Sequence, residues 1–219
     1  MKKYFVIGNP INHSLSPELH NFWIKKNNIN AIYEKIKLEE NELENFINRL
    51  RNNEIHGINV TVPFKNKVIK YLDKLSLEVE TTGSVNTIYK NGSDIIGHNT
   101  DVAGFELGLR HSKINVLHKS ILILGAGGVV PSIIYSLLSM GCKKIFLSNR
   151  TVEKAEKIKE KFDDIDILKW GEIPDFDIII NATSVGLKGD SLDLDFNVKD
   201  KVFYDVIYNP KETQFLRNA

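Results

Sequence analysis

The chain has 219 residues, of which 42% are apolar and 26% are charged, so it can bury one large hydrophobic core or two smaller ones. Its 29 basic and 28 acidic residues leave a formal net charge of only +1, which argues against a nucleic acid or a membrane surface as a partner. The single cysteine, Cys142, excludes an internal disulfide, and no apolar stretch approaches the roughly 18–20 residues of a membrane-spanning helix.

Strand and helix patterns alternate through the first half of the chain. The apolar stretch at 4–8 is too short for the core of a signal peptide and predicts a first strand. Pro17 suits the first turn of a helix, and the pair Asn91-Gly92 indicates a hairpin turn. Strands are expected over residues 4–8, 32–38, 57–62, 84–88 and 95–97, and helices from Ser16, over 41–51 and after Pro63.

The second half continues with a strand–helix–strand unit of about 30 residues, which is typical of a parallel sheet. Strands are expected over residues 120–124, 144–148, 177–180 and 202–206, and helices over 101–111 and 129–140. Because the type of motif changes between residues 101 and 120, we expect two α/β domains, 1–101 and 102–219, with a cleft between them.

A glycine loop follows the strand expected at 120–124 and opens the next helix. Gly125, Gly127 and Gly128 would let backbone N–H groups approach a pyrophosphate, whose charge the positive end of a helix favours. Glycines also suit a tight turn for steric reasons alone. The strand before the loop and the helix after it nevertheless favour dinucleotide binding, so the C-terminal domain is expected to be a Rossmann-type parallel sheet.

The residues after the second strand of this domain distinguish NAD from NADP. NAD-binding enzymes place a carboxylate there for the ribose 2′-hydroxyl, whereas this chain has Asn149-Arg150-Thr151 and no carboxylate before Glu153. Arg150 can pair with a 2′-phosphate through its planar guanidinium. Alternatively, Arg150 is a solvated charge and Thr151 only caps the next helix. Both can hold, because capping leaves the guanidinium free, and NADP is the favoured cofactor.

Polar clusters in the first hundred residues suit a polyhydroxylated acid. Ser14 and Ser16 in an extended backbone would point to one side and bond a carboxylate, unless Ser16 is an ordinary N-cap. Asn59 and Thr61 would share one face of their strand, and Lys65 would fall in the first turn of the helix that follows. The clusters lie at residues 14–17, 59–65, and 84–87 with 97–101.

These motifs resemble the shikimate dehydrogenase family, in order and in spacing, over nearly the whole chain. The N-terminal ones are G-N-P-I-x-H-S-L-S-P at 8–17, N-V-T-V-P-F-K at 59–65, V-N-T at 85–87 and N-T-D at 99–101. The C-terminal ones are G-A-G-G at 125–128, N-R-T at 149–151, N-A-T-S-V-G at 181–186 and Y-N-P-K-E-T-Q-F-L at 208–216. Several of them are specific to the family, unlike the glycine loop.

The resemblance implies an NADP-dependent oxidoreductase that reversibly reduces 3-dehydroshikimate to shikimate in chorismate and aromatic amino acid biosynthesis. Residues 1–101 would then bind shikimate and residues 102–219 NADP. Lys65 and Asp101 are the implied catalytic pair, and a lysine suits the chemistry because the C3 oxygen needs a base in one direction and an acid in the other. The implied substrate-binding residues are Ser14, Ser16, Asn59, Thr61, Asn86 and Tyr208. The implied NADP-binding residues are Gly125, Ala126, Gly127, Gly128, Val129, Asn149, Arg150, Thr151, Thr183, Ser184 and Val206.

Three rival interpretations remain open. A quinate or quinate/shikimate dehydrogenase, which often uses NAD, is disfavoured by Arg150. A catalytically impaired, truncated paralogue that still binds NADP and shikimate is disfavoured by the presence of both Lys65 and Asp101. A different two-domain Rossmann enzyme, such as a methylenetetrahydrofolate dehydrogenase, is disfavoured by the serine cluster at 14–16 and by the order of the motifs.

The sequence departs from the family at two places. Val129-Val130-Pro131 stands where small and basic residues are commoner, so one phosphate contact is expected to be lost. Family members usually continue past the last motif, so we expect C-terminal helices to be missing and the activity of this span to be low. The six histidines are scattered, so no metal site is expected. We expect a cytoplasmic monomer or homodimer whose partner is its small-molecule substrate.

Overall fold

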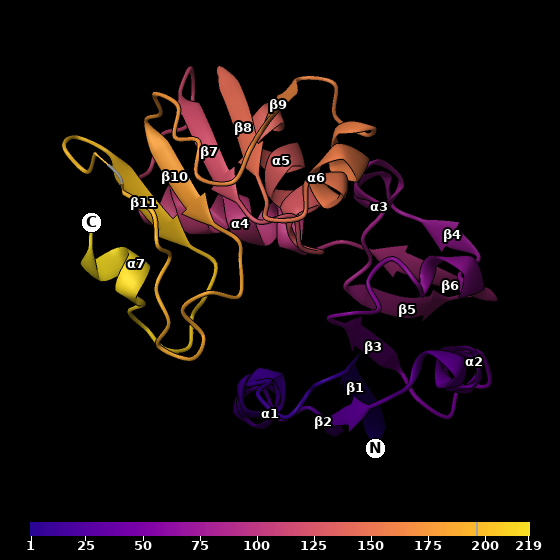
Figure 1. Ribbon diagram of the computed structural model, residues 1–219. Helices are drawn as coiled ribbons and strands as arrows, with labels where there is room; N and C mark the ends of the chain where they lie inside the picture. Colours follow the sequence, from indigo (N-terminus) through magenta and orange to yellow (C-terminus); the bar gives the residue numbers. More distant parts are fainter. Residues whose placement is uncertain (196) are drawn as a thin grey trace. The chain divides into compact units, whose positions relative to one another are not determined.

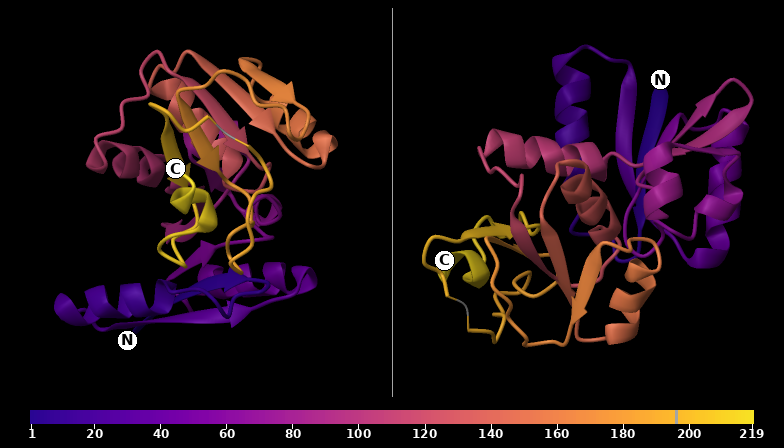
Figure 2. Two further views of the ribbon diagram at one scale, coloured as in Figure 1. Left: turned by 60° about the vertical axis from the view of Figure 1, so that its left-hand side comes forward. Right: turned by 90° about the horizontal axis from the view of Figure 1, so that it is seen from above.

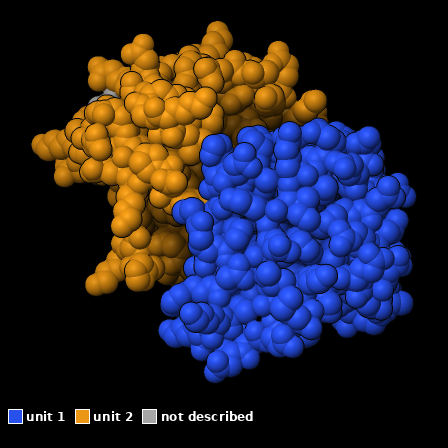
Figure 3. Space-filling view, turned by 90° about the horizontal axis from the view of Figure 1, so that it is seen from below, with its two compact units in different colours: residues 1–101 blue, residues 102–219 orange. Residues whose placement is uncertain are grey.

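The computed structural model describes residues 1–195 and 197–219 and divides the chain into two compact units, Met1–Asp101 and Val102–Ala219 (Figures 1 and 3). Each unit is built on its own sheet, the first mixed and the second all parallel. The α/β class, with a Rossmann-type parallel sheet in the C-terminal half, is therefore confirmed.

The first unit contains a six-stranded sheet of order β2-β1-β3-β5-β6-β4. Its strands are β1 (Lys2–Gly8), β2 (Ala31–Lys37), β3 (Gly57–Val60), β4 (Lys74–Leu75), β5 (Thr87–Asn91) and β6 (Asp94–His98). β1 pairs in parallel with β2 and β3, whereas β5 runs antiparallel to β3 and β6. β5 and β6 form the expected hairpin, whose turn contains Gly92 at a φ of +62°.

Helices cover both faces of this first sheet. α2 (Leu43–Arg51) places Leu43, Phe46, Ile47 and Leu50 in a core with Phe5, Ile7 and Ile58, as its helical spacing predicts. α3 (Leu77–Thr82) adds Val79 to that core. On the opposite face, α1 (Ser16–Lys26) packs through Ile24 near Val6, Ile11 and Tyr33. Short 3₁₀ turns occur at η1 (Glu40–Glu42) and η2 (Ile69–Tyr71).

Two expectations about residues 57–72 are wrong. The strand ends at Val60 instead of residue 62, so Asn59 and Thr61 do not share a strand face. The helix expected after Pro63 is absent from the described residues, where turns lead instead into η2. In a helix the carbonyl of Lys65 would accept the N–H of the residue four positions later. Here it accepts the backbone N–H of Val85 instead, at 2.8 Å.

The second unit contains a parallel sheet of order β11-β10-β7-β8-β9. Its strands are β7 (Ser120–Leu124), β8 (Lys144–Ser148), β9 (Ile165–Leu168), β10 (Ile178–Asn181) and β11 (Val202–Asp205). The chain runs outward from β7 to β9 and then returns to β10 on the other side of β7. The strand order therefore reverses between β7 and β10, and in such sheets ligands bind at the carboxyl ends of the strands at this point.

Alternating residues of β7 face two different layers. Ile121 and Ile123 lie in a core with residues of α4 (Asp101–His111), α5 (Val130–Ser139) and α6 (Val152–Lys159). Leu122 and Leu124 belong to a second core on the other face, with α7 (Gln214–Arg217), which lies beside β11 (Figures 1 and 2). None of the helices in the described part of the chain is long and apolar enough to cross a membrane.

Candidate active site

Lys65 and Asp101 form an ion pair in the first unit. The Lys65 Nζ donates to the Asp101 Oδ2 at 2.5 Å, and the two side chains are 14% and 24% exposed. Lys65 is positioned by the turns after β3, and Asp101 is the first residue of α4. The partial burial of both groups strengthens their attraction, yet leaves access for a small molecule.

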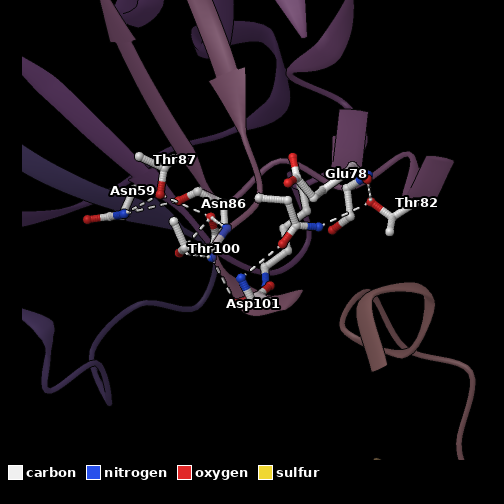
Figure 4. A network of polar contacts seen from close by, with 10 residues as sticks. Asn59, Glu78, Thr82, Asn86, Thr87, Thr100 and Asp101 are labelled. Carbon is white, nitrogen blue, oxygen red and sulfur yellow. Dashed lines mark hydrogen bonds and ion pairs between the residues drawn. The ribbon is translucent and has the colours of Figure 1, made fainter. Parts of the chain in front are cut away.

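The Asp101 carboxylate is oriented by a network of amides and hydroxyls (Figure 4). Asn86 Nδ2 donates to its second oxygen, Oδ1, at 2.8 Å. Asn86 is fixed in turn, because its Oδ1 accepts the backbone N–H of Thr100 at 2.9 Å and the Thr87 hydroxyl at 3.0 Å. The backbone N–H of Asp101 donates to Asn99 Oδ1 at 2.9 Å. Each oxygen of Asp101 therefore has a separate donor, which holds the carboxylate in one orientation.

Asn59 supports this network from β3. Its Nδ2 donates to the carbonyl of Asn86 and to the hydroxyl of Thr87, both at 3.1 Å, while its Oδ1 accepts the Tyr33 hydroxyl at 2.6 Å. Burial raises the pKa of the Tyr33 phenol, and a hydrogen bond with the side chain of Ser16 offsets part of that rise. Both ends of the Asn59 amide therefore bond to other groups of the protein. The sequence predicted instead that Asn59 lines the substrate pocket.

Ser14 and Ser16 lie at the start of α1, but not in the predicted extended backbone. Leu15 between them has φ −88° and ψ 1°, and the Ser14 Oγ accepts the backbone N–H of Ser16 at 3.3 Å. The alternative that Ser16 is an N-cap is also wrong, because Leu15 holds the N-cap position and Ser16 is the first helical residue. The Ser14 hydroxyl keeps a proton that can be donated to an anion, whereas the Ser16 hydroxyl also makes a hydrogen bond with the side chain of Tyr33.

The two remaining candidates for substrate binding follow strands. Thr61 comes directly after β3, and its backbone N–H donates to the carbonyl of Ile7 at 3.0 Å. Tyr208 follows β11 in the second unit, and 67% of its surface is exposed.

The glycine loop lies between β7 and α5 and approaches the end of β10 closely. Gly125 has a φ of +105°, and a Cβ on it would lie 2.7 Å from the carbonyl oxygen of Ala182. Gly127 has more room, since its Cβ would meet the same oxygen only at 3.8 Å. Val129 is the N-cap of α5, so the positive end of the helix dipole adjoins the loop. The loop thus has the glycine backbone and the positive electrostatic potential of a helix N-terminus, both of which suit a pyrophosphate.

Asn149, Arg150 and Thr151 follow β8. Asn149 joins them to the glycine loop, because its Oδ1 accepts the backbone N–H of Ala126 at 3.1 Å while its Nδ2 donates to the carbonyl of Thr151 at 2.7 Å. Arg150 is exposed. Thr151 occupies the N-cap position of α6, but its side chain makes no capping hydrogen bond to the described residues, so the capping interpretation is wrong in that respect.

The other cofactor candidates end neighbouring strands of the same sheet. Thr183 and Ser184 follow β10, and Val206 follows β11, where its N–H donates to the carbonyl of Asn181 at 3.1 Å. All the cofactor candidates therefore lie at the carboxyl edge of the parallel sheet, and they fit a dinucleotide. No cluster of three His, Cys, Asp or Glu side chains that could hold a metal ion occurs in residues 1–195 or 197–219.

Comparisons with known proteins identify relatives of both halves of the chain. Residues 6–88 match the family described as the shikimate dehydrogenase substrate binding domain, and residues 108–187 match the shikimate / quinate 5-dehydrogenase family. A shikimate dehydrogenase (NADP(+)) from Pelagibacter ubique is 58% identical over 223 residues, which cover 100% of this chain and 84% of that protein.

Solved structures also match this chain over its full length. The shikimate dehydrogenase of Aquifex aeolicus has a TM-score of 0.91 at 40% identity, with 100% of this chain and 83% of that chain covered. The shikimate 5-dehydrogenase of Thermus thermophilus, solved in complex with NADP(H) and shikimate, has a TM-score of 0.88 at 29% identity, with 100% and 84% covered.

Proposed function

The chain belongs to the shikimate dehydrogenase family, and from this premise we propose that Lys65 and Asp101 are the groups that move the proton in its reaction. The enzyme is an NADP-dependent oxidoreductase that reversibly reduces 3-dehydroshikimate to shikimate in the shikimate pathway. The single observation that supports the catalytic pair is the 2.5 Å contact between the two side chains, in a network that also holds Asn86.

When bound, NADPH supplies a hydride to C3 of 3-dehydroshikimate, and NADP⁺ accepts one in the reverse direction. The C3 oxygen must then gain a proton as the ketone becomes a hydroxyl, and the Lys65 ammonium is the group that donates it. In the oxidation of shikimate, the neutral Lys65 amine takes that proton back. Asp101 keeps Nζ in one place and stabilises the ammonium, and Asn86 keeps Asp101 in position.

The other candidates divide between the substrate and the cofactor. The hydroxyls of Ser14 and Ser16 would bond the substrate carboxylate, while Thr61, Asn86 and Tyr208 would bond ring hydroxyls. We assign shikimate binding to residues 1–101 and NADP binding to residues 102–219. We place the enzyme in the cytoplasm as a monomer or homodimer.

A rate comparison with two substrates and two cofactors tests this function. The purified chain is incubated with shikimate or quinate, each with NADP⁺ or NAD⁺, and formation of the reduced nicotinamide is followed by absorbance. We expect the highest kcat/KM for shikimate with NADP⁺. A preference for quinate, or for NAD⁺, would contradict the proposal.

Arg150 is expected to set the preference for NADP. Arg150→Ala should raise the KM for NADP⁺ by about tenfold, since a hydrogen-bonded charge pair contributes about 1.5–3 kcal/mol and an exposed one less. The KM for NAD⁺, which lacks the 2′-phosphate, should change little. Arg110→Ala in the last turn of α4 removes another exposed arginine as the control. Equal KM changes for both cofactors would exclude a 2′-phosphate contact.

A further inference from the structure

A carboxylate at the end of β11 has hydrogen-bond donors from three separate parts of the second unit. Asp205 Oδ1 accepts the backbone N–H of Ile207 at 2.9 Å. Its Oδ2 accepts the hydroxyl of Thr213 at 2.5 Å and the Nδ2 of Asn181 at 3.2 Å. An ionised carboxylate only accepts hydrogen bonds, and here both oxygens meet donors in fixed positions. Asp205 was not among the residues that the sequence singled out.

The loop after β10 is built on the neighbour of Asp205. Asn181 is fully buried, and its Oδ1 accepts both the backbone N–H and the hydroxyl of Thr183, at 3.1 and 2.7 Å. Its Nδ2 also donates to the carbonyl of Val185 at 3.1 Å. Asp205 accepts from the same Nδ2, so together with the Thr183 N–H and the Val185 carbonyl it holds the Asn181 amide in one orientation, and through it the loop that carries Thr183 and Ser184.

The loop after β11 is closed by the same carboxylate. Thr213 is 1% exposed and lies at the N-cap of α7, so its hydrogen bond to Asp205 joins the two ends of the segment 206–212. Tyr208 lies within this segment and is 67% exposed, so few packing contacts of its own hold it. The position of Tyr208 therefore depends on how firmly the ends of the loop are held.

We propose that Asp205 is a positioning residue of this enzyme, which fixes Thr183 for the cofactor and Tyr208 for the substrate by joining their two loops. The inference rests on the proposed function, because it takes the roles of Thr183 and Tyr208 from there. Apolar side chains would close the same loops without the cost of desolvating a carboxylate. A network of directed hydrogen bonds, in contrast, holds loops in a single geometry, as a site for two ligands requires.

Substitutions at 205 and 213 separate the two branches of the network, which are the hydrogen bond from Asn181 to Asp205 and the hydrogen bond from Thr213 to Asp205. Thr213→Ala, which removes only the branch to the loop 206–212, should raise the KM for shikimate about tenfold and leave the Kd for NADP⁺ within about twofold. Asp205→Asn keeps one acceptor oxygen and replaces the other with an NH₂ group, so either the Asn181 amide and the Thr213 hydroxyl or the Ile207 N–H must face a donor. It should raise the KM for shikimate about tenfold in either orientation, and the Kd for NADP⁺ as well when the NH₂ group faces Asn181. Thr213→Ser keeps the hydroxyl and should restore the KM.

The measurements are steady-state KM values, the Kd for NADP⁺ by calorimetry without substrate, and amide hydrogen exchange of residues 206–212. Exchange there should be faster in Thr213→Ala and normal in Thr213→Ser. Asp175→Asn is the control, since this carboxylate is 99% exposed.

Unchanged exchange, KM and Kd in both Thr213→Ala and Asp205→Asn would overturn the proposal, as would Thr213→Ser behaving like Thr213→Ala. Failure of the proposed function would show differently, because the unsubstituted enzyme would then not oxidise shikimate. The exchange and NADP⁺-binding measurements test the role of Asp205 in either case.

Discussion

Replacing Lys65 with alanine is expected to lower the turnover of shikimate by about 10²–10⁴-fold, the usual contribution of a positioned general acid–base group. The loss should appear in kcat, because the transfer of the proton takes place in the transition state. The Kd for NADP⁺ should hardly change, since Lys65 is not among the residues proposed to bind the cofactor. Initial rates with saturating shikimate, together with calorimetric titration of NADP⁺, measure the two quantities.

Lys67→Ala provides the matched control for this experiment. Lys67 lies two residues further along the same turns and pairs with Glu40, and both side chains of this pair are at least one-third exposed. Exposed ion pairs contribute only about 0–1 kcal/mol, so this variant should keep its turnover. A Lys65→Ala enzyme with near-normal turnover would remove Lys65 from the catalytic step.

Gly125→Ala should weaken NADP⁺ binding by about a hundredfold. The added Cβ would lie 2.7 Å from the carbonyl oxygen of Ala182, and that backbone atom cannot rotate away as the end of a side chain can. The φ of +105° adds strain of about 1–3 kcal/mol for any residue with a Cβ. The loop must therefore move away from β10, and the N–H groups it presents to the pyrophosphate move with it. Titration of NADP⁺ measures the loss.

Gly171→Ala separates conformational strain from the clash. Gly171 has a similar φ of +94°, but a Cβ there would meet nothing within 4 Å. This variant should lose about 1 kcal/mol of stability in thermal unfolding and keep its affinity for NADP⁺. Similar affinities in the two variants would mean that the close approach of Gly125 to Ala182 has no part in binding.

The strands and helices with regular apolar spacing could be predicted from the sequence. β7 has the expected bounds and α2 nearly so, because β7 has a run of four apolar residues after Ser120 and α2 has a strongly periodic apolar pattern. The segment after Pro63 could not be predicted. Its apolar residues Phe64 and Val68 are buried as in a helix, but the carbonyl of Lys65 bonds to Val85, twenty residues away in the sequence. Such a contact leaves no local signal.

The residues of the candidate site that belong to a sequence motif could be predicted. The hydrogen bonds that these residues make with the rest of the protein could not. Lys65 and Asp101 were paired through family motifs, and the structure places them in contact. The contacts of Asn59 with Tyr33 and Asn86 were not predictable, because they join three separate strands or loops. Tyr33 belongs to no motif, although it is the one residue of β2 that the structure buries. The polar residues that orient the site escape sequence analysis because buried hydrogen bonds form between residues distant in the chain.

A double-substitution cycle on the catalytic pair tests the central claim most directly. Lys65→Ala, Asp101→Asn and the double variant are compared by kcat for shikimate oxidation with saturating NADP⁺. Because Asp101 acts by holding and stabilising the Lys65 ammonium, the double variant should be no slower than about the Lys65→Ala variant alone. If instead the two losses multiply, or if Asp101→Asn leaves kcat unchanged, the two residues do not act as one unit and the account is wrong.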